Sequence, residues 1–186
     1  MSQPASTIYT RLGDDGSTGR LFGGRLPKDD VVVEACGDID ETVSALGVAR
    51  AALDDPELAA LVLRLQRELF VVAADLSAGP RSRDRLTAGL TLVTAEMTGR
   101  LEQTIDRLVG ERPLRPVFVV PGSTPASAAL DLARAVARRA ERHVFTARAR
   151  DPRVSSELVA YLNRLSDLLY VLARHAAGPD EPPSHE

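Results

Sequence analysis

Three arginines in the C-terminal half of the chain recur at steps of four residues. Arg134, Arg138 and Arg142 would share one face of a helix, because residues four apart are neighbours on a helix surface. A triphosphate carries about four negative charges, and each charge-assisted hydrogen bond to it contributes roughly 1.5–3 kcal/mol. Two or three of these arginines could therefore supply most of the binding of a triphosphate. The alternative, which is commoner for such a pattern, is a solvated basic face with local ion pairs.

A second stretch suited to anions lies near the N-terminus. Residues 10–20 are rich in glycine and hydroxyl side chains, and Gly23-Gly24 follows shortly. Glycines let the backbone turn several N–H groups toward one anion, and Ser17 and Thr18 add hydroxyl donors. The composition predicts either a phosphate-binding arm that folds in tight turns or a flexible N-terminal tail. Positive charge surrounds the stretch, on Arg11, Arg20 and Lys28.

Five amphipathic helices are expected to position these groups, since apolar residues recur at steps of three and four. Aspartate, serine or threonine before the helix, often with a proline, is typical of a helix start. The first expected helix begins after Asp29-Asp30. The other four are expected from Asp55-Pro56 to Gly79-Pro80, from about Thr87 to Gly110, from Ser123-Thr124-Pro125 to about Arg148, and from Ser155 to about His175.

The predicted fold is all-α, a five-helix up-and-down bundle with an irregular glycine-rich N-terminal arm. We expect the arm at residues 1–29, the helical bundle domain at 30–177, and a proline-rich, acidic, disordered tail at 178–186. Residues 81–85 are expected to form a charged loop. Residues 117–120 are expected to form an extended loop on the bundle, with Phe118 by default in the core.

Composition excludes several functional classes. The 186 residues suit one domain, and a net charge of −3 implies no general attraction to nucleic acid or to an anionic membrane. A single cysteine, Cys36, excludes an intrachain disulfide and a cysteine-rich zinc site. The Glu-x-x-His pattern of di-metal bundles and the Walker pattern of P-loop proteins are both missing. With no recognisable signal peptide or membrane span, a cytoplasmic location is expected.

Several blocks of sequence, in the order of a known family, carry a more specific signal. Between residues 8 and 41 the chain contains Tyr9-Thr10-Arg11, Gly13-Asp14, Lys28-Asp29-Asp30 and Asp40-Glu41. The C-terminal blocks are Phe118-Val119-Val120-Pro121-Gly122, Ala133-Arg134 with Arg138-Arg139-Ala140-Glu141-Arg142, and Tyr161-Leu162-Asn163-Arg164-Leu165-Ser166-Asp167. Together these blocks, over roughly residues 8 to 175, resemble the PduO-type ATP:cob(I)alamin adenosyltransferases.

The resemblance implies a homotrimer with an active site at each subunit interface. It implies transfer of the 5′-deoxyadenosyl group of ATP to the cobalt of cob(I)alamin, with release of triphosphate. ATP would be accompanied by Mg²⁺, whose protein ligands the sequence does not identify, although Asp14 is a candidate. Cobalamin would be a substrate, and the product could be handed to an adenosylcobalamin-dependent enzyme.

The resemblance also assigns roles to residues. Phe118 would lie beneath the corrin ring and exclude the lower axial ligand, and Asp40 and Arg134 would form an intersubunit ion pair that shapes the site. The phosphates would be wrapped by one subunit, through Thr10, Arg11, Leu12, Gly13, Thr18, Gly19 and Lys28. The neighbouring subunit would complete the ATP site with Arg138, Arg139, Glu141, Arg142 and Asn163.

Five positions depart from the family's usual pattern and leave alternatives open. The negative charges at Asp15 and Asp131 should weaken ATP binding. A non-catalytic paralogue that binds ATP or cobalamin as a sensor or carrier is therefore the second hypothesis, and a helical interaction module is the third. The departures are Leu12, Asp15, Val43, Ser123 and Asp131, where threonine, lysine, asparagine, glycine and histidine are usual.

Overall fold

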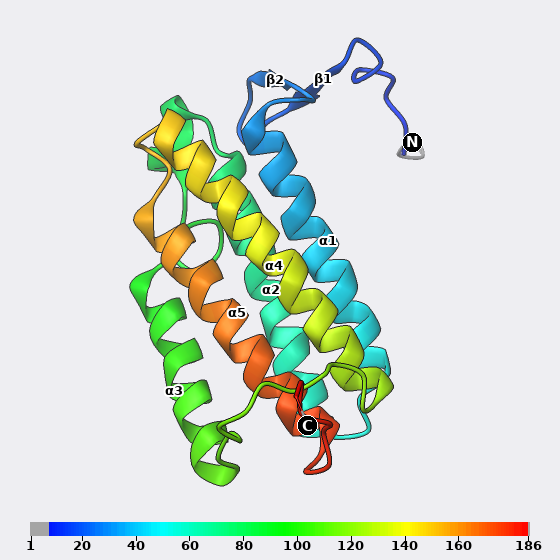
Figure 1. Ribbon diagram of the computed structural model, residues 1–186. Coiled ribbons are helices and arrows are strands. Elements are labelled where there is room, and N and C mark those ends of the chain that lie inside the picture. Colours follow the sequence, from blue (N-terminus) through cyan, green and yellow to red (C-terminus); the bar gives the residue numbers. More distant parts are fainter. Residues whose placement is uncertain (1–7, 186) are drawn as a thin grey trace, which may run out of the picture.

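A computed structural model describes residues 8–185 and contains five α-helices and one small antiparallel sheet (Figure 1). The expected helical bundle is confirmed. None of the helices in the described part is long and apolar enough to cross a membrane. The elements are β1 (Ser17–Gly19), β2 (Arg25–Pro27), α1 (Val31–Ala51), α2 (Pro56–Ser77), the 3₁₀ helix η1 (Pro80–Arg85), α3 (Ala95–Glu111), α4 (Pro125–Arg150) and α5 (Ser156–Ala177).

Side-chain caps explain why four helix starts could be predicted closely. Asp30 accepts a hydrogen bond from the backbone N–H of Val32, and Asp55 accepts one from Glu57. Thr124 forms a reciprocal capping box with Ser127, and Ser155 caps α5. Each cap satisfies backbone donors that have no partner inside the helix.

Helix α4 lies between α1 and α5, and this position decides which of its faces can bind a ligand. Its inward face consists of small buried residues, which allow the neighbouring helices to approach closely. The opposite face carries the arginines. The buried residues of α4 include Ala133, Ala137, Ala140, Val144 and Ala147.

Two predictions between α2 and α4 were wrong in detail. Helix α3 begins at Ala95 instead of about Thr87, because residues 87–92 form a turn in which the Thr87 carbonyl accepts three backbone N–H groups. Leu90, which falls within the expected helix, is exposed in that turn. The expected loop at residues 81–85 belongs to η1, which a 2.6 Å ion pair between Arg83 and the buried Asp75 holds against α2.

The N-terminal arm is more regular than its composition indicates. Strands β1 and β2 pair as a hairpin in which Thr18 lies opposite Leu26. Arg20 attaches the hairpin to the bundle, since its guanidinium donates to the carbonyls of Ser77 and Ala78 at the end of α2. A cation there also offsets the negative end of the helix dipole.

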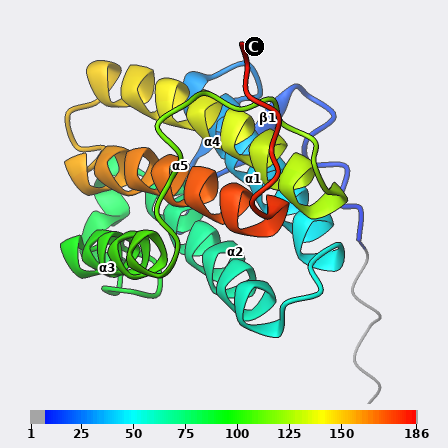
Figure 2. The same cartoon turned by 60° about the horizontal axis from the view of Figure 1, so that its bottom comes forward.

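The expectation of a disordered C-terminal tail is corrected for residues 178–185, which fold back across one end of the bundle beside the loop before α4 (Figure 2). Glu181 is only 5% exposed, and Pro183 forms an antiparallel bridge with Val119. Proline and acidic residues predict disorder because they rarely bury surface. Here Arg174 on α5 forms an ion pair with the acidic side chain of Glu181. Glu186 and residues 1–7 lie outside the described residues.

Candidate functional site

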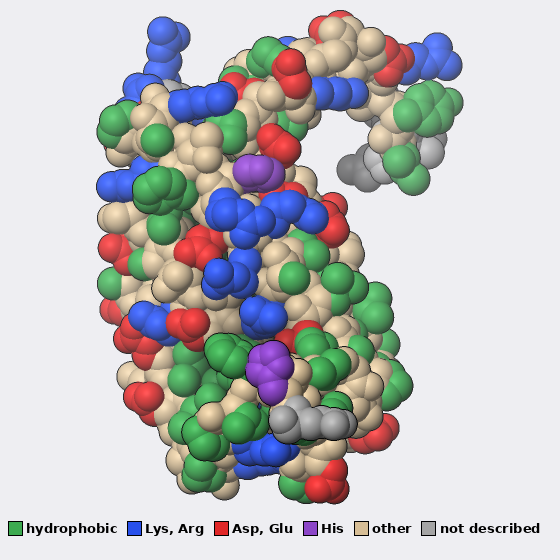
Figure 3. Space-filling view, viewed as in Figure 1, with side chains coloured by type: hydrophobic (Ala, Val, Ile, Leu, Met, Phe, Trp, Pro, Cys, Tyr) green, Lys and Arg blue, Asp and Glu red, His purple; other side chains and the backbone are tan. Residues whose placement is uncertain are grey.

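The outward face of α4, the adjoining face of α5 and one side of α3 form a groove of two pockets that share Arg138. The first pocket has a volume of about 420 Å³, and its lining includes Glu141, Arg142 and Asn163. The second, of about 630 Å³, is lined by residues such as Arg134, Asp167 and Tyr170. Blue side chains mark this groove along the front of the molecule (Figure 3). Together the pockets are large enough for a nucleotide and part of a second substrate.

Arg138 and Arg142 make no ion pair with any carboxylate of the described residues. Both side chains are exposed, and Arg142 Nη1 donates to the backbone carbonyl of Arg138 at 2.9 Å. Opposite them, Asn163 Nδ2 donates to Glu141 Oε1 at 2.9 Å. The groove therefore presents two unneutralised guanidinium groups beside a fixed polar pair, which is an arrangement suited to an anion.

The Arg139 side chain binds carboxylates of α1 and so joins α4 to α1. Its Nε donates to Asp38 Oδ1 at 2.8 Å, and its Nη2 donates to Glu41. The hydrogen bond to Asp38 and the negative charge of that carboxylate raise the pKa of Arg139. Asp38 also lies 2.5 Å from Nδ1 of His143. This α1–α4 cluster was not predicted, although Glu34, Asp38 and Glu41 are spaced to share a helix face.

Arg134 is held by Asp131, with 3.4 Å between Nε and Oδ1, and its guanidinium lies 6.0 Å from the centre of the Tyr170 ring. Asp40 is exposed on α1 and makes no ion pair within the described residues of this chain. The expected contact between Asp40 and Arg134 is thus not made within one subunit. The added charge of Asp131 is also neutralised locally, because Arg174 binds the same carboxylate.

Phe118 is 81% exposed, so the default interpretation of this residue as part of the core was wrong. It lies on the loop that joins α3 to α4, near the same end of α5 as Tyr170. A large apolar side chain in water has no stabilising role of its own. An exposed apolar ring of this size is available for contact with a ligand or another protein surface.

In the arm, Lys28 lies close to the first glycine turn. A Cβ atom placed on Gly13 would lie 3.5 Å from Lys28 Cε and Nζ, so the ammonium group borders the turn. Arg11 adopts a positive φ of 60°, which turns the chain sharply beside Gly13. Thr10, Arg11 and Leu12 are exposed, as is Gly19, whereas Thr18 is half-buried in the hairpin.

The extra acidic residue in the arm is also engaged locally. Asp15 accepts hydrogen bonds from the Ser17 hydroxyl at 2.7 Å and from the Ser17 backbone, and it lies 3.5 Å from Arg25. These interactions, above all the Ser17 hydroxyl, lower the pKa of Asp15. Its charge is therefore partly balanced before any ligand binds.

The arm and the arginine face are not brought together within one chain. Figure 3 shows the arm projecting from the top of the bundle with open space beneath it. Among the described residues, no hydrogen bond or ion pair joins residues 8–28 to Arg134, Arg138, Arg139 or Arg142. Among residues 8–185, no group of three or more histidine, cysteine, aspartate or glutamate side chains is placed to hold a metal ion.

Comparison with known proteins identifies the family. Residues 8–176 match the family model of the cobalamin adenosyltransferases. The chain is 40% identical over 167 residues to the corrinoid adenosyltransferase of Citrobacter freundii, which covers 90% of this chain and 93% of that protein. It is 43% identical over 172 residues to that of Mycobacterium leprae, with 91% and 90% covered.

Among solved structures, a variant of the PduO-type ATP:corrinoid adenosyltransferase from Lactobacillus reuteri, complexed with cobalamin and ATP, has a similar fold. The TM-score is 0.86 at 28% identity, with 97% of this chain and 100% of that chain covered. The chain belongs to the cobalamin adenosyltransferase family, as its sequence blocks led us to expect.

Proposed function

We propose that this protein transfers the 5′-deoxyadenosyl group of ATP to the cobalt of cob(I)alamin and releases triphosphate. The observation that carries the proposal is the pair of unneutralised arginines, Arg138 and Arg142, in a groove beside Glu141 and Asn163. Membership of the cobalamin adenosyltransferase family supports this reading over a non-catalytic sensor or carrier. So does the local engagement of the two departures that argued against activity: Arg174 neutralises Asp131, and Arg25 partly balances the charge of Asp15.

The chemistry requires little from the protein beyond position and charge. The electron pair of Co(I) forms the bond to the ribose C5′, while the C5′–O bond breaks and its electron pair leaves with the triphosphate. No general base is needed, because no proton is removed. The protein must align the two reacting atoms and stabilise the departing negative charge, which preorganised arginines do well.

The proposed ATP site combines two subunits. One supplies the arm, where Lys28 borders the turn at Gly13, and its neighbour supplies the arginine groove. Arg139, which is held by Asp38, would orient the groove from its edge. Mg²⁺ would reach the site bound mainly to the ATP phosphates. The full proposed set is Thr10, Arg11, Leu12, Gly13, Thr18, Gly19 and Lys28 from one subunit, and Arg138, Arg139, Glu141, Arg142 and Asn163 from the other.

Assembly as a homotrimer would complete this site. Phe145, which lines the groove beside Arg138 and Arg142, is 63% exposed, and Leu132, also on α4, is 61% exposed. Exposed apolar side chains around a charged groove are typical of a surface that another protein covers. Asp40 of one subunit would then reach Arg134 of the next. The trimer would act in the cytoplasm and could pass its product to an enzyme that uses it.

The corrin would lie over Phe118, next to the pocket that contains Arg134 and Tyr170. An apolar ring below the cobalt would exclude an axial ligand and make the Co(II) form easier to reduce. Phe118→Ala should therefore slow adenosylation that starts from Co(II) more than adenosylation that starts from Co(I). Equal slowing would argue against this role.

The direct test is an anaerobic assay with chemically reduced cobalamin and ATP, followed through the corrin spectrum. We expect adenosylcobalamin and triphosphate to form in equal amounts. ATP binding in calorimetry without adenosylcobalamin would reject the enzyme in favour of the sensor or carrier.

A further inference from the structure

The C-terminal tail makes backbone hydrogen bonds with the segment that carries Phe118. The N–H of Ser184 donates to the carbonyl of Phe118 at 2.8 Å, and the N–H of Val120 donates to the carbonyl of Pro182 at 2.9 Å. These two bonds flank Val119 and form the antiparallel bridge to Pro183. The tail therefore fixes the backbone on both sides of one residue in an otherwise irregular loop.

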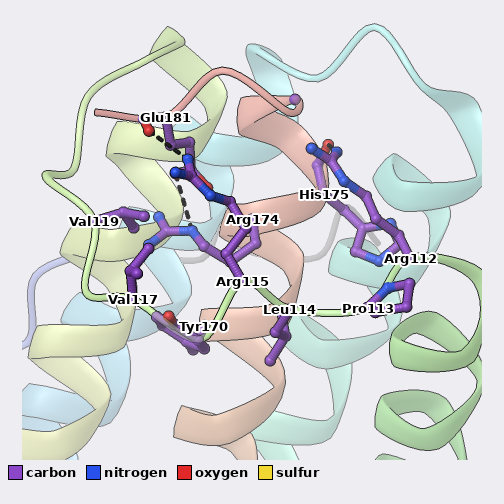
Figure 4. A pocket seen from close by; sticks show the side chains of 11 residues that line it. Arg112, Pro113, Leu114, Arg115, Val117, Val119, Tyr170, Arg174, His175 and Glu181 are labelled. Atoms are coloured by element: carbon purple, nitrogen blue, oxygen red, sulfur yellow. Dashed lines mark hydrogen bonds and ion pairs between the residues drawn. The ribbon is translucent and has the colours of Figure 1, made fainter. Parts of the chain in front are cut away.

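A buried ionic cluster anchors the tail at this place. Arg174, which is 7% exposed, forms an ion pair with Glu181 (Figure 4). Its guanidinium also pairs with Asp131 on α4. Its Nε is 3.0 Å from Glu181 Oε1, close enough for an ion pair although the angle does not make a hydrogen bond. Arg115, from the loop itself, donates to the Glu181 carbonyl at 2.6 Å. One tail residue thus contacts both α5 and the loop.

The fit around this cluster is close. The cavity bounded by Arg174, Glu181, Val119 and Tyr170 has a volume of about 30 Å³, which is the space of about one water molecule. Release of the tail would separate Glu181 from Arg174 and leave this buried guanidinium paired with Asp131 alone. The tail covers the end of α5 instead of extending into solvent.

The backbone around Phe118 depends on these hydrogen bonds for its position, because the Phe118 side chain does not pack against the bundle. The ring is 81% exposed and cannot hold the loop by packing. A loop residue without backbone partners retains its conformational entropy, and ordering it for a substrate costs free energy. The hydrogen bonds from the tail would reduce that cost before a substrate arrives.

We propose that residues 181–184 position Phe118 for its role beneath the corrin, with the Arg174–Glu181 pair as the anchor. This inference rests on the proposed function. Phe118 touches the substrate, whereas Ser184, Pro182 and Arg174 act only through its backbone. Loss of the tail should therefore affect the step that depends on Phe118 and spare the step that does not.

Ser184→Pro is the sharpest variant, since it removes the N–H that donates to Phe118 and keeps Glu181 in place. The preceding Pro183 lies in an extended bridge, which is the conformation that a following proline favours. Ser184→Ala keeps the N–H and is the matched control. A chain that ends at Ala177 removes the tail and leaves all five helices complete.

Adenosylation is measured from Co(II), with a reduced flavin in excess as electron donor, and separately from chemically prepared Co(I). We expect Ser184→Pro to slow the Co(II) reaction about 2- to 10-fold, which corresponds to one hydrogen bond, and to change the Co(I) reaction by less than about 2-fold. Truncation should slow the Co(II) reaction further. Equal slowing of both reactions, or slowing by Ser184→Ala, would overturn the proposal.

Hydrogen exchange supplies a readout that needs no substrate. Truncation should speed exchange at the Val120 amide, because its acceptor on Pro182 is removed. Unchanged exchange at Val120 would also overturn the positioning role. If the full chain fails to adenosylate even from Co(I), the proposed function fails, while the exchange experiment still decides whether the tail holds the loop.

Discussion

The two ends of this chain are both rich in residues that break helices, yet they relate to the bundle in opposite ways. The N-terminal arm touches the bundle mainly at its hairpin and projects from it, with Thr10, Arg11 and Leu12 exposed. The C-terminal tail buries Glu181 against Arg174 and hydrogen-bonds to the loop before α4. The arm, whose polar groups have few partners in the bundle, is available to bind another molecule. The tail, whose polar groups are hydrogen-bonded or ion-paired within the chain, stabilises its own subunit.

A substitution in the arginine groove should have the largest single effect on ATP binding. The groove supplies the positive charge of Arg138 and Arg142, which no carboxylate of the described residues neutralises. Arg138→Ala should weaken ATP binding about 10- to 100-fold, corresponding to roughly 1.5–3 kcal/mol for a charge-assisted contact. Calorimetry with ATP measures this directly. Arg107→Ala, on α3 and outside the groove, is the control, since Arg107 pairs with Glu111. Unchanged affinity in Arg138→Ala would remove the groove from the phosphate site.

Truncations compare the two ends most directly. Removal of residues 1–19 should change Tm by less than about 2 °C, since few groups of the bundle lose partners. Removal of residues 178–186 should cost about 2 kcal/mol, or roughly 4–8 °C in Tm, through lost hydrogen bonds and packing. Scanning calorimetry without ligands measures both. A reversed order would mean that the arm, and not the tail, belongs to the folded core.

Leu12 tests whether the arm lacks a donor that its relatives have. Leu12→Thr adds a hydroxyl at an exposed turn, and one neutral hydrogen bond should tighten ATP binding about 2- to 10-fold. Leu12→Val changes shape without adding a hydroxyl. Equal effects of the two variants would show that the side chain at this position does not reach the nucleotide.

Asp15 should give the smallest effect. Its pKa is lowered, chiefly by the Ser17 hydroxyl, so the carboxylate is charged at neutral pH and already engaged. Because a lowered carboxylate pKa stabilises the folded hairpin above the ordinary pKa, this support should be lost only as the pH falls through the lowered value. Asp15→Asn should change ATP affinity by less than about 2-fold at pH 7. A large gain would mean that Asp15 repels the phosphates despite its local partners.

The helices could be predicted because their information is local. Asp30, Asp55, Thr124 and Ser155 cap their helices through residues no more than three positions away. The start of α3 was missed for the opposite reason. The Val93 N–H donates to Asp75 at 2.9 Å, a contact across 18 residues that favours the turn over a longer helix.

The candidate site divides in the same way. The spacing of Arg134, Arg138 and Arg142 predicted a shared face, and the groove contains Arg134 and Arg138 in one pocket and Arg138 and Arg142 in the other. Arg139 contacts Asp38, which lies 101 positions away on α1. Glu181, in the tail, contacts Arg174 on α5, seven positions away. No periodicity encodes such contacts. The exposure of Phe118 likewise depends on how the loop crosses the bundle.

The central claim is that each ATP site joins the arm of one subunit to the arginine groove of another, and mixed assemblies test it most directly. Lys28→Ala impairs only the arm and Arg138→Ala only the groove, so each variant alone should have little adenosyltransferase activity. When the two are unfolded, mixed in equal amounts and refolded together, about one quarter of the interfaces in a random trimer should contain both intact halves. We predict that activity rises toward that fraction of the unmutated protein. Activity that stays at the average of the two single variants would contradict the claim and place both halves of the site in one chain.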